Sequence, residues 1–551
     1  MIFPSLFAAA PPPHAGLGML DVVSIIGYLL VTLGIVVWAS RKQNDTDDFF
    51  LGGRKLPWFA VGLSIMATLF SSISYVGNSG EIIKNGMVTF YKYLAYIPSV
   101  GVIIYLFIPF FMRLRLTSGY EYLERRFDRR VQLLGGLMFI WMRIGWISTV
   151  MFAGSLAMSR MMGMPTVYVI MALGLLATVY AWFGGMKAVI WNDVLQAVML
   201  FGGAGLILVY VMITTGTGID DWWARASSGS AGRTTPIFFD FNPFVRATIL
   251  TAIIDGFFWQ ICTHSSDQVV LQRYFTTTSV RSARNSFLIN ITASLSITVL
   301  LAISGLALLY FYLEYPAYLG DGLTVSLDPG KMSKADEIMP YFYAHQLPIG
   351  IGGLILAAFL CDAMQTLVSG VNSIAAVVSG DLFEQKSKSS TDAIGIASHS
   401  KADDAKQLLF ARITTVLVGL LCTGVACFIP SINAETGRNI IDLMPRLFNF
   451  LLGPMSTLFV AGMFMPHVGA RAVLVGSLTS LATAILWCWA NELGLTGDRG
   501  DLSPFWVVGL ASMTGYSTTW LAGHVLERKP PTGLDFTWRE VMKRPAPVES
   551  D

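Results

Sequence analysis

Apolar residues recur along this chain in runs of about 20 residues, and short polar stretches separate the runs. A helix of that length crosses a hydrocarbon core of about 30 Å, because it rises about 1.5 Å per residue. Hydrophobic residues make up 54% of the chain and charged residues only 13%, about half the charged fraction of a typical soluble domain. The pattern predicts an all-α polytopic membrane protein with thirteen spans, at 19–40, 56–81, 88–114, 132–160, 164–182, 188–213, 247–271, 284–313, 350–382, 408–430, 440–465, 470–492 and 503–525.

Lysine and arginine residues are divided unequally between the two sides of these spans. Loops rich in basic residues stay in the cytoplasm, so the basic side is the inner one. We therefore expect a multi-pass protein of the cell membrane with its N-terminus outside and its C-terminus in the cytoplasm. The basic loop residues include Arg41, Lys42, Arg125, Arg126, Arg281 and Lys386.

Several classes of function lack support in the sequence. No GxxxxGK[ST] motif occurs, which argues against a pump driven by ATP. No His/Glu metal motif or nucleophile elbow indicates an enzyme, because His264 and His467 stand alone at the ends of spans. The net charge of +2 gives no indication of a nucleic-acid partner. We expect no catalytic residues and favour transport of a small solute across the lipid bilayer.

An acidic residue, Asp193, lies inside the apolar stretch YAWFGGMKAVIWNDVLQAVMLFGG at 180–203. An ionisable group at membrane depth costs a few kcal/mol, so it is a candidate for handling an ion or a proton. The structural alternative is an acid near a helix end that pairs with Lys187.

The second predicted span carries a run of small and polar residues, ATLFSSIS at 67–74, at membrane depth. Carbonyl groups freed by a break in the helix there would suit a cation. The alternative is a packing seam between helices, which small residues also favour.

Three stretches in chain order resemble the signatures of the sodium:solute symporter family: 180–203, DQVVLQRYFTTTSVRSARNS at 267–286, and ADEIMPYFYAHQLPIGIGGLILAAFL at 335–360. The resemblance implies a leucine-transporter-like core of two inverted five-helix repeats, with additional helices. In such folds the first helix of each repeat is broken, and substrate and ions bind at the break.

The resemblance implies the following organisation: an extracellular tail at 1–18, an additional span and loop at 19–55, a first repeat at 56–213, an outer loop at 214–246, a second repeat at 247–465, two additional spans at 466–526 and a cytoplasmic tail at 527–551. Within the second repeat lie an outer loop at 314–349 and a polar cytoplasmic linker at 385–406. Both outer loops contain aromatic residues and proline, so we expect them to fold back over the membrane face.

By the same resemblance, sodium binds between the broken helix and the span at 350–382. The carbonyls of Ala67, Phe70 and Asp362 and the side chain of Thr366 match the family ligands, and Gln365 stands where a hydroxyl is expected. Asp362 is a second departure, because the family usually has a small residue there. Either Asp362 supplies a carboxylate, with Gln365 donating to it or giving its amide oxygen to the ion, or Asp362 faces a water-filled cavity.

A second sodium site, known in part of the family, would use Asp193, Thr366 and Ser369. One further hydroxyl of that site is replaced by Val368 in this chain. A second ion is therefore a hypothesis rather than a direct implication of the match.

The expected solute site surrounds the same break. Arg143 begins a helix whose family counterpart lines the cavity, and a guanidinium matches the two oxygens of a carboxylate. The alternative is that Arg143 pairs with Asp255 or Asp193. The residues that hexose-transporting members use are replaced by Ile73 and Ser74. The remaining candidates are Thr68, Leu69, Ser71, Ser72, Ser74, Asp255 and Trp259.

These expectations together describe a sodium-coupled symporter that imports a small organic anion, such as a monocarboxylate or sugar acid, by alternating access. A sugar or polyol symporter is the first alternative, and a membrane sensor of solutes is another. Sodium ions, the solute and the bilayer are the expected partners, and the sequence does not determine the oligomeric state.

Overall fold

The computed structural model describes residues 18–40, 46–114, 116, 118–183, 185–228, 234–378, 401–436, 440–527 and 531–545. Within these ranges the chain is helical, and its only extended pairing is an isolated bridge between Thr324 and Ser333. Residues 1–17 of the expected tail at 1–18 and most of the linker at 385–406 lie outside the described residues.

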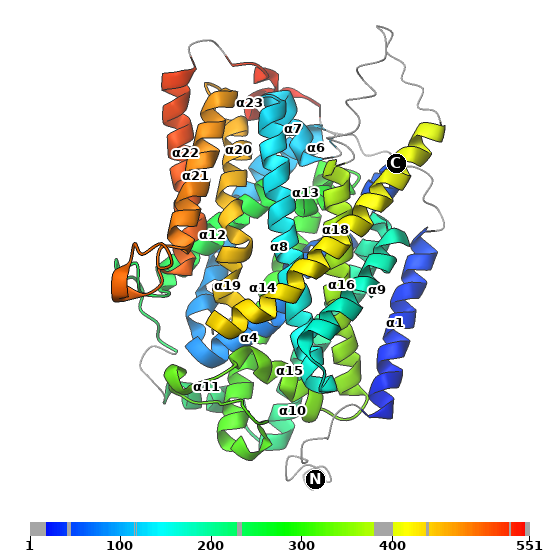
Figure 1. The fold of residues 1–551 in the computed structure, drawn as a ribbon, viewed down its shortest axis with the longest axis vertical. Coiled ribbons are helices and arrows are strands. Elements are labelled where there is room, and N and C mark those ends of the chain that lie inside the picture. Colours follow the sequence, from blue (N-terminus) through cyan, green and yellow to red (C-terminus); the bar gives the residue numbers. More distant parts are fainter. Residues whose placement is uncertain are drawn as a thin grey trace.

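Each of the thirteen predicted spans contains a helix (Figure 1). Among the described residues, eight helices are long and apolar enough to cross a membrane, and two bent helix pairs raise that number to ten. The three other predicted spans correspond to α9, α12 and α22, which are shorter or less apolar. The principal helices are α1 (Met19–Ser40), α3 (Trp58–Leu69), α4 (Ser72–Asn85), α8 (Arg129–Met162), α9 (Thr166–Phe183), α10 (Met186–Thr215), α12 (Ile249–Ser266), α14 (Val280–Glu314), α16 (Ile351–Val378), α18 (Lys401–Thr436), α19 (Ile440–Leu447), α20 (Leu452–Phe464), α21 (Ala470–Cys488) and α22 (Val507–Leu526).

The predicted break in the second span is present, between α3 and α4. Phe70 leaves helical geometry with φ −106° and ψ 74°, Ser71 is extended, and the two helices meet at an angle of 57°. A broken helix at membrane depth must satisfy its freed backbone groups within the protein, since lipid offers no partner. The break is therefore a position for a bound ion or a compensating side chain.

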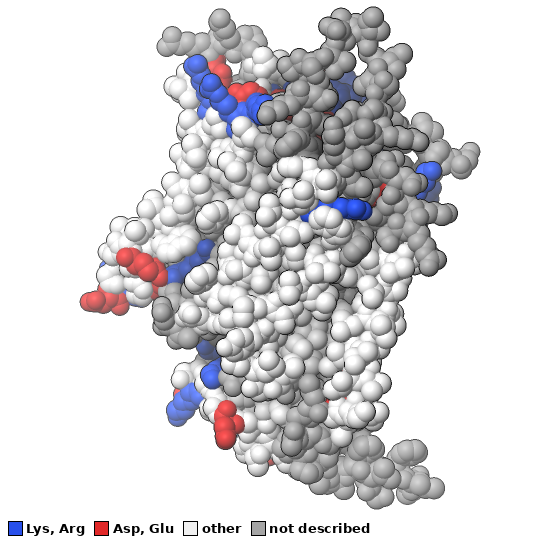
Figure 2. All heavy atoms as spheres, turned by 45° about the vertical axis from the view of Figure 1, so that its right-hand side comes forward, with Lys and Arg blue, Asp and Glu red and all other residues white. Residues whose placement is uncertain are grey.

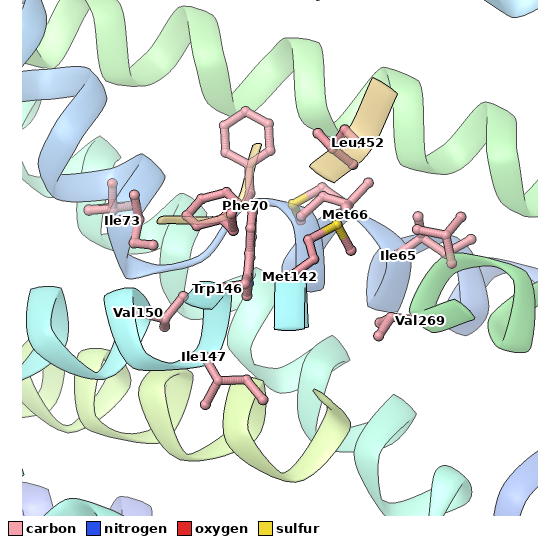
Figure 3. Close-up of a cluster of buried hydrophobic side chains, with 14 of the residues drawn as sticks. Ile65, Met66, Phe70, Ile73, Met142, Trp146, Ile147, Val150, Val269 and Leu452 are labelled. Atoms are coloured by element: carbon pink, nitrogen blue, oxygen red, sulfur yellow. The ribbon is translucent and has the colours of Figure 1, made fainter. Parts of the chain in front are cut away.

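Apolar side chains from four regions of the chain surround this break (Figure 3). Met66 and Phe70 come from the end of α3, and Met142 and Trp146 approach from α8. Val269 and Leu452, the latter at the start of α20, come from the other two regions. These apolar side chains offer the freed backbone groups no hydrogen-bond partner, so the polar groups of the break must find partners elsewhere.

A second interruption separates α12 from α13 (Gln268–Phe275). Asp267 lies between them with φ −79° and ψ 113°, and its side chain accepts a hydrogen bond from the Val269 amide. The first helix of each expected repeat is therefore broken, as the resemblance implied. α19 and α20 are also bent against each other, by 41°.

The two long loops at 214–246 and 314–349 contain helices that pack on the membrane domain, as expected. α11 (Ile219–Ser227) contacts α14, and α15 (Ala335–His345) contacts α4 and α8 (Figure 1). These loops therefore cover part of one end of the helix bundle.

The first helix, α1, is attached to the core at both ends. At its N-terminal end, the buried Asp21 carboxylate accepts hydrogen bonds of 2.7 Å from the amides of Gly350 and Gly353, at the start of α16. An acid at a helix N-terminus satisfies free amides and complements the helix dipole. At the other end, Trp38 packs edge-on against Trp191 of α10.

Charge is distributed as a membrane protein requires. On the face shown in Figure 2, Lys, Arg, Asp and Glu gather mainly toward the two ends, and a broad, largely uncharged surface lies between them. Many large apolar side chains of the described helices are exposed, Leu33 of α1 and Val179 of α9 among them. A hydrocarbon environment accounts for that exposure.

Candidate ion and solute site

Asp362 of α16 connects directly to the break in the first repeat. Its Oδ2 accepts a hydrogen bond from the Ser72 amide at the start of α4, and its Oδ1 accepts one from the side-chain amide of Gln196 on α10. The residue is only 1% exposed. Asp362 is therefore shielded from solvent rather than facing a water-filled cavity.

Gln365 lies beside Asp362 but donates its hydrogen bond elsewhere. Its Nε2 donates to the Tyr180 hydroxyl of α9 at 2.9 Å, and Asn192 of α10 donates to the same oxygen. In the described part of the chain the buried Gln365 Oε1 has no hydrogen-bond partner. Of the two roles considered for Gln365, donation to Asp362 is wrong, and its amide oxygen remains available to a cation.

The other expected sodium ligands occupy suitable elements. Thr366 lies four residues after Asp362, so both project from one face of α16, and both are buried. Ala67 and Phe70 lie at the C-terminal end of α3, where helix carbonyls lack intrahelical partners. These oxygens suit a small hard cation, and sodium fits this donor set.

The expected second sodium position is occupied by an arginine side chain. Arg273 of α13 donates from Nη2 to Asp193 Oδ2 and to the Ser369 hydroxyl, each at 3.0 Å. Its Nε donates to Ser64, which itself bonds to Asp193. The alternative pairing of Asp193 with Lys187 is wrong, because Lys187 lies over the Trp38 ring instead.

Arg143 of α8 has a different partner from those considered. Its Nη2 donates to both carboxylate oxygens of Asp267, at 2.9 and 2.7 Å, so the pairing with Asp255 or Asp193 is wrong. The guanidinium also lies 5.6 Å from the centre of the Trp146 ring. Both charged groups are almost fully buried, and the pair ties α8 to the break between α12 and α13.

A cavity of about 80 Å³ adjoins the break on the other side from α16. Four predicted solute residues line it: Leu69, Ser74, Asp255 and Trp259. Thr68, Ser71, Ser72 and Arg143 are not among its lining residues. The lining residues that sequence reasoning missed include Lys92, Tyr93, Tyr96, Trp146, Asn449 and Phe505, and Phe70 was expected only as a sodium ligand.

A larger hollow of about 210 Å³ shares Pro445 and Pro504 with this cavity. Arg246 lines it and bridges two helices, because it donates to Glu81 of α4 at 2.5 Å and to Asp442 of α19 at 2.8 Å. The two hollows meet at these prolines, and Arg246 links α4 to α19 beside them.

Helices broken at membrane depth, oxygen ligands suited to sodium and an adjoining cavity with a mixed polar and aromatic lining together define an ion-coupled secondary transporter. The model of the sodium:solute symporter family matches residues 49–480. This chain belongs to that family, and it is a sodium-coupled symporter of the membrane with a leucine-transporter-like fold.

Named relatives fall into more than one substrate group. A sodium/sialic acid symporter from Proteus mirabilis is 30% identical, over 86% of this chain and 91% of the relative. Human sodium-coupled monocarboxylate transporter 1 is 28% identical, over 85% of this chain and 72% of the relative. A solved substrate-bound, outward-open Na+-coupled sialic acid symporter aligns with a TM-score of 0.77 and 27% identity, over 92% of this chain and 98% of that chain.

Proposed function

We propose that this symporter imports a small organic anion, such as a monocarboxylate or a sugar acid, together with sodium. The observation that carries the proposal is the presence of Lys92 in the wall of the cavity beside the broken helix. The named solutes of the relatives, sialic acid and monocarboxylates, each contain a carboxylate. A cation in the cavity wall would attract that group.

The rest of the cavity supports a solute with further polar groups. Trp146 and Asn449 line the cavity, and the indole N–H and the amide oxygen are buried without a partner in the described residues. A buried polar group left unpaired costs about 1–3 kcal/mol, so a solute that pairs with both gains binding energy. Hydroxyl and carboxylate groups meet that requirement.

Arg143 remains a second candidate for carboxylate binding. It lies against Trp146, one turn away along α8, and its Nε has no partner among the described residues. The other side of the guanidinium is engaged by Asp267. Arg143 does not line the cavity in this conformation, so in this proposal its Nε reaches the solute only as the repeats rock, while Asp267 holds its orientation.

For the ion, we propose a site formed by the carbonyls of Ala67 and Phe70 with Asp362, Gln365 and Thr366. The Asp362 carboxylate neutralises the cation and joins α16 to α4, while the free Gln365 oxygen replaces the missing hydroxyl. The inverted repeats at 56–213 and 247–465 would then rock around this position in alternating access.

A neutral sugar or polyol is the alternative solute, favoured by Ser74, Asp255 and Asn449 in the cavity wall. Uptake into proteoliposomes of monocarboxylates, sugar acids and neutral sugars, each with and without a sodium gradient, separates the two. Lys92→Gln should raise the half-saturating concentration of an anion about tenfold, as loss of a charged hydrogen bond implies. The exposed Lys331→Gln is the matched control. If the transported solute is a neutral sugar, and if Lys92→Gln and Lys331→Gln take it up equally well, the anion proposal is overturned.

The sodium site has its own test. Thr366→Ala removes one oxygen ligand, so the sodium concentration for half-maximal uptake should rise while protein insertion stays normal. An unchanged sodium dependence would remove Thr366 from the site.

A further inference from the structure

Two opposite charges line the solute cavity without pairing with each other. Lys92 of η2 (Met87–Ala95) and Asp255 of α12 both belong to its wall, and both are half-buried. Among the described residues neither side chain makes a hydrogen bond or an ion pair, and Lys92 only lies over the Tyr93 ring, with Nζ 5.1 Å from its centre. Charged groups at membrane depth are costly unless they are paired, so these two are candidates for contact with a solute.

The backbones that carry the two charges are in contact. Gly256, next to Asp255, leaves so little space that an added Cβ would lie 2.4 Å from the Lys92 carbonyl oxygen. The two side chains therefore leave the cavity wall close together, although no ion pair joins their ends. Two groups of a solute that bind the ammonium and the carboxylate at once must themselves be neighbours on the solute.

We propose that Asp255 is a specificity-determining residue that selects 2-hydroxy acids, the anions with a hydroxyl on the carbon beside the carboxylate. This inference rests on the proposed import of an organic anion. Lys92 binds the carboxylate, and Asp255 accepts a hydrogen bond from the neighbouring hydroxyl. A hydrogen bond to a charged acceptor is stronger than one between neutral groups, and a site built to bond a solute hydroxyl rejects the analogue that lacks it.

An amino group on the same carbon fits this wall less well than a hydroxyl. Tyr93, also in the wall, accepts a hydrogen bond from Asn78 Nδ2 at 3.2 Å, and its own hydroxyl hydrogen is accepted by no group in the described part of the chain. A solute hydroxyl can accept that hydrogen, whereas an ammonium has no lone pair to offer. An ammonium beside Asp255 would also lie near the Lys92 ammonium, and like charges repel.

Calorimetric titration of the purified full-length protein in saturating sodium tests the selection without reference to transport. The ligands are two matched pairs, lactate with propionate and gluconate with 2-deoxygluconate, and each pair differs only by the hydroxyl beside the carboxylate. The wild type should bind the hydroxylated member of a pair about tenfold more tightly, as a hydrogen bond to a charged group implies. Alanine, which carries an ammonium at the same carbon as lactate, should bind more weakly than lactate.

Variants of Asp255 assign the preference to this side chain. Asp255→Leu should bind both members of a pair equally, with the affinity of the wild type for the member without the hydroxyl. Asp255→Asn keeps an acceptor oxygen and the size of the side chain, so it should retain part of the preference. The exposed Asp220→Leu of α11 is the matched control and should behave as wild type.

Three results would overturn the role of Asp255: equal binding of both members by the wild type, a preference that survives in Asp255→Leu, or tighter binding of alanine than of lactate. A merely structural role would weaken both members of a pair by the same factor in Asp255→Leu, which also contradicts the proposal. If no carboxylate binds and a neutral sugar does, the proposed import of an anion fails together with this inference. Equal binding within the pairs overturns only the selection by Asp255.

Discussion

Tyr180 occupies a position that links the lipid-facing surface to the proposed ion site. Its hydroxyl accepts hydrogen bonds from Gln365 and Asn192, and both amides are buried. Orientation of Gln365 therefore depends on a residue that lies outside the ion site. Because Gln365 Nε2 donates to this hydroxyl, the Gln365 amide oxygen faces away from Tyr180.

Tyr180→Phe should raise the half-saturating sodium concentration about five- to tenfold, the equivalent of about 1 kcal/mol for one lost hydrogen bond. Sodium-dependent uptake and sodium-induced thermal stabilisation both report the change. Tyr122→Phe is the control, because Tyr122 is buried against Phe110 and Phe459 and its hydroxyl has no hydrogen-bond partner among the described residues. Equal sodium affinity in the two variants would show that Tyr180 does not position Gln365.

Asp336 introduces a pH-sensitive group outside the membrane-spanning segments. Burial raises the pKa of its carboxyl to about 7, the hydrogen bond from the Ile440 amide opposes that rise, and the acids Glu81 and Asp442 reinforce it while Lys84 opposes it. Arg246 neutralises part of this acidic group through Glu81 and Asp442. The folded state therefore favours protonated Asp336.

Because the pKa of Asp336 is higher in the folded state than in the unfolded chain, protonated Asp336 contributes to stability. That contribution is fully present below the pKa of the unfolded chain and is lost as the pH rises to about 7. The free energy of unfolding of the wild type, measured by thermal unfolding between pH 5 and pH 8, should fall relative to that of Asp336→Asn. The fall should be on the order of 1 kcal/mol per pH unit below pH 7. Parallel curves for the two proteins would contradict the assignment.

At the scale of elements, Arg273 joins α13 to three other helices through Asp193 of α10, Ser64 of α3 and Ser369 of α16. A guanidinium thereby takes the place where a second sodium was expected. Movement of α13 would uncover Asp193 and Ser369 together, because one side chain covers both.

Arg273→Gln should make folding strongly dependent on sodium. Removing one partner of a buried ion pair costs about 3–5 kcal/mol, unless another cation binds the exposed acid. The melting temperature of the variant should be low in choline and should rise more steeply with sodium than that of wild type. Arg273→Gln with Asp193→Asn is the control, and it should lose the steep sodium dependence. A variant stabilised equally by sodium and choline would exclude a second ion at this place.

At the scale of the whole molecule, the uneven distribution of basic residues predicts the orientation in the bilayer. Single cysteines at Asp328, in the outer loop before α15, and at Arg130, at the start of α8, should label from opposite sides of sealed cells. The native cysteines are buried or half-buried, so a membrane-impermeant maleimide should react with them slowly. If position 130 is labelled in intact cells and position 328 is protected, the orientation is the reverse of the predicted one.

The sequence alone determined the parts of this protein that depend on short-range pattern. Apolar runs located the spans, and the family resemblance together with the polar run at 67–74 located the break between α3 and α4. Both succeed for one physical reason. Lipid offers no hydrogen bonds, so a spanning segment must be an apolar helix, and polar residues at that depth mark an exception.

Tertiary structure decided which charged groups meet. Arg143 and Asp267 are 124 residues apart, and Arg273 lies 80 residues from Asp193, so no local pattern relates them. The choice among Asp193, Asp255 and Asp267 as partner of Arg143 depends on how α8 packs against the α12–α13 break. A buried charge needs one well-placed counter-charge, and only the packing of distant helices fixes which acid lies within reach.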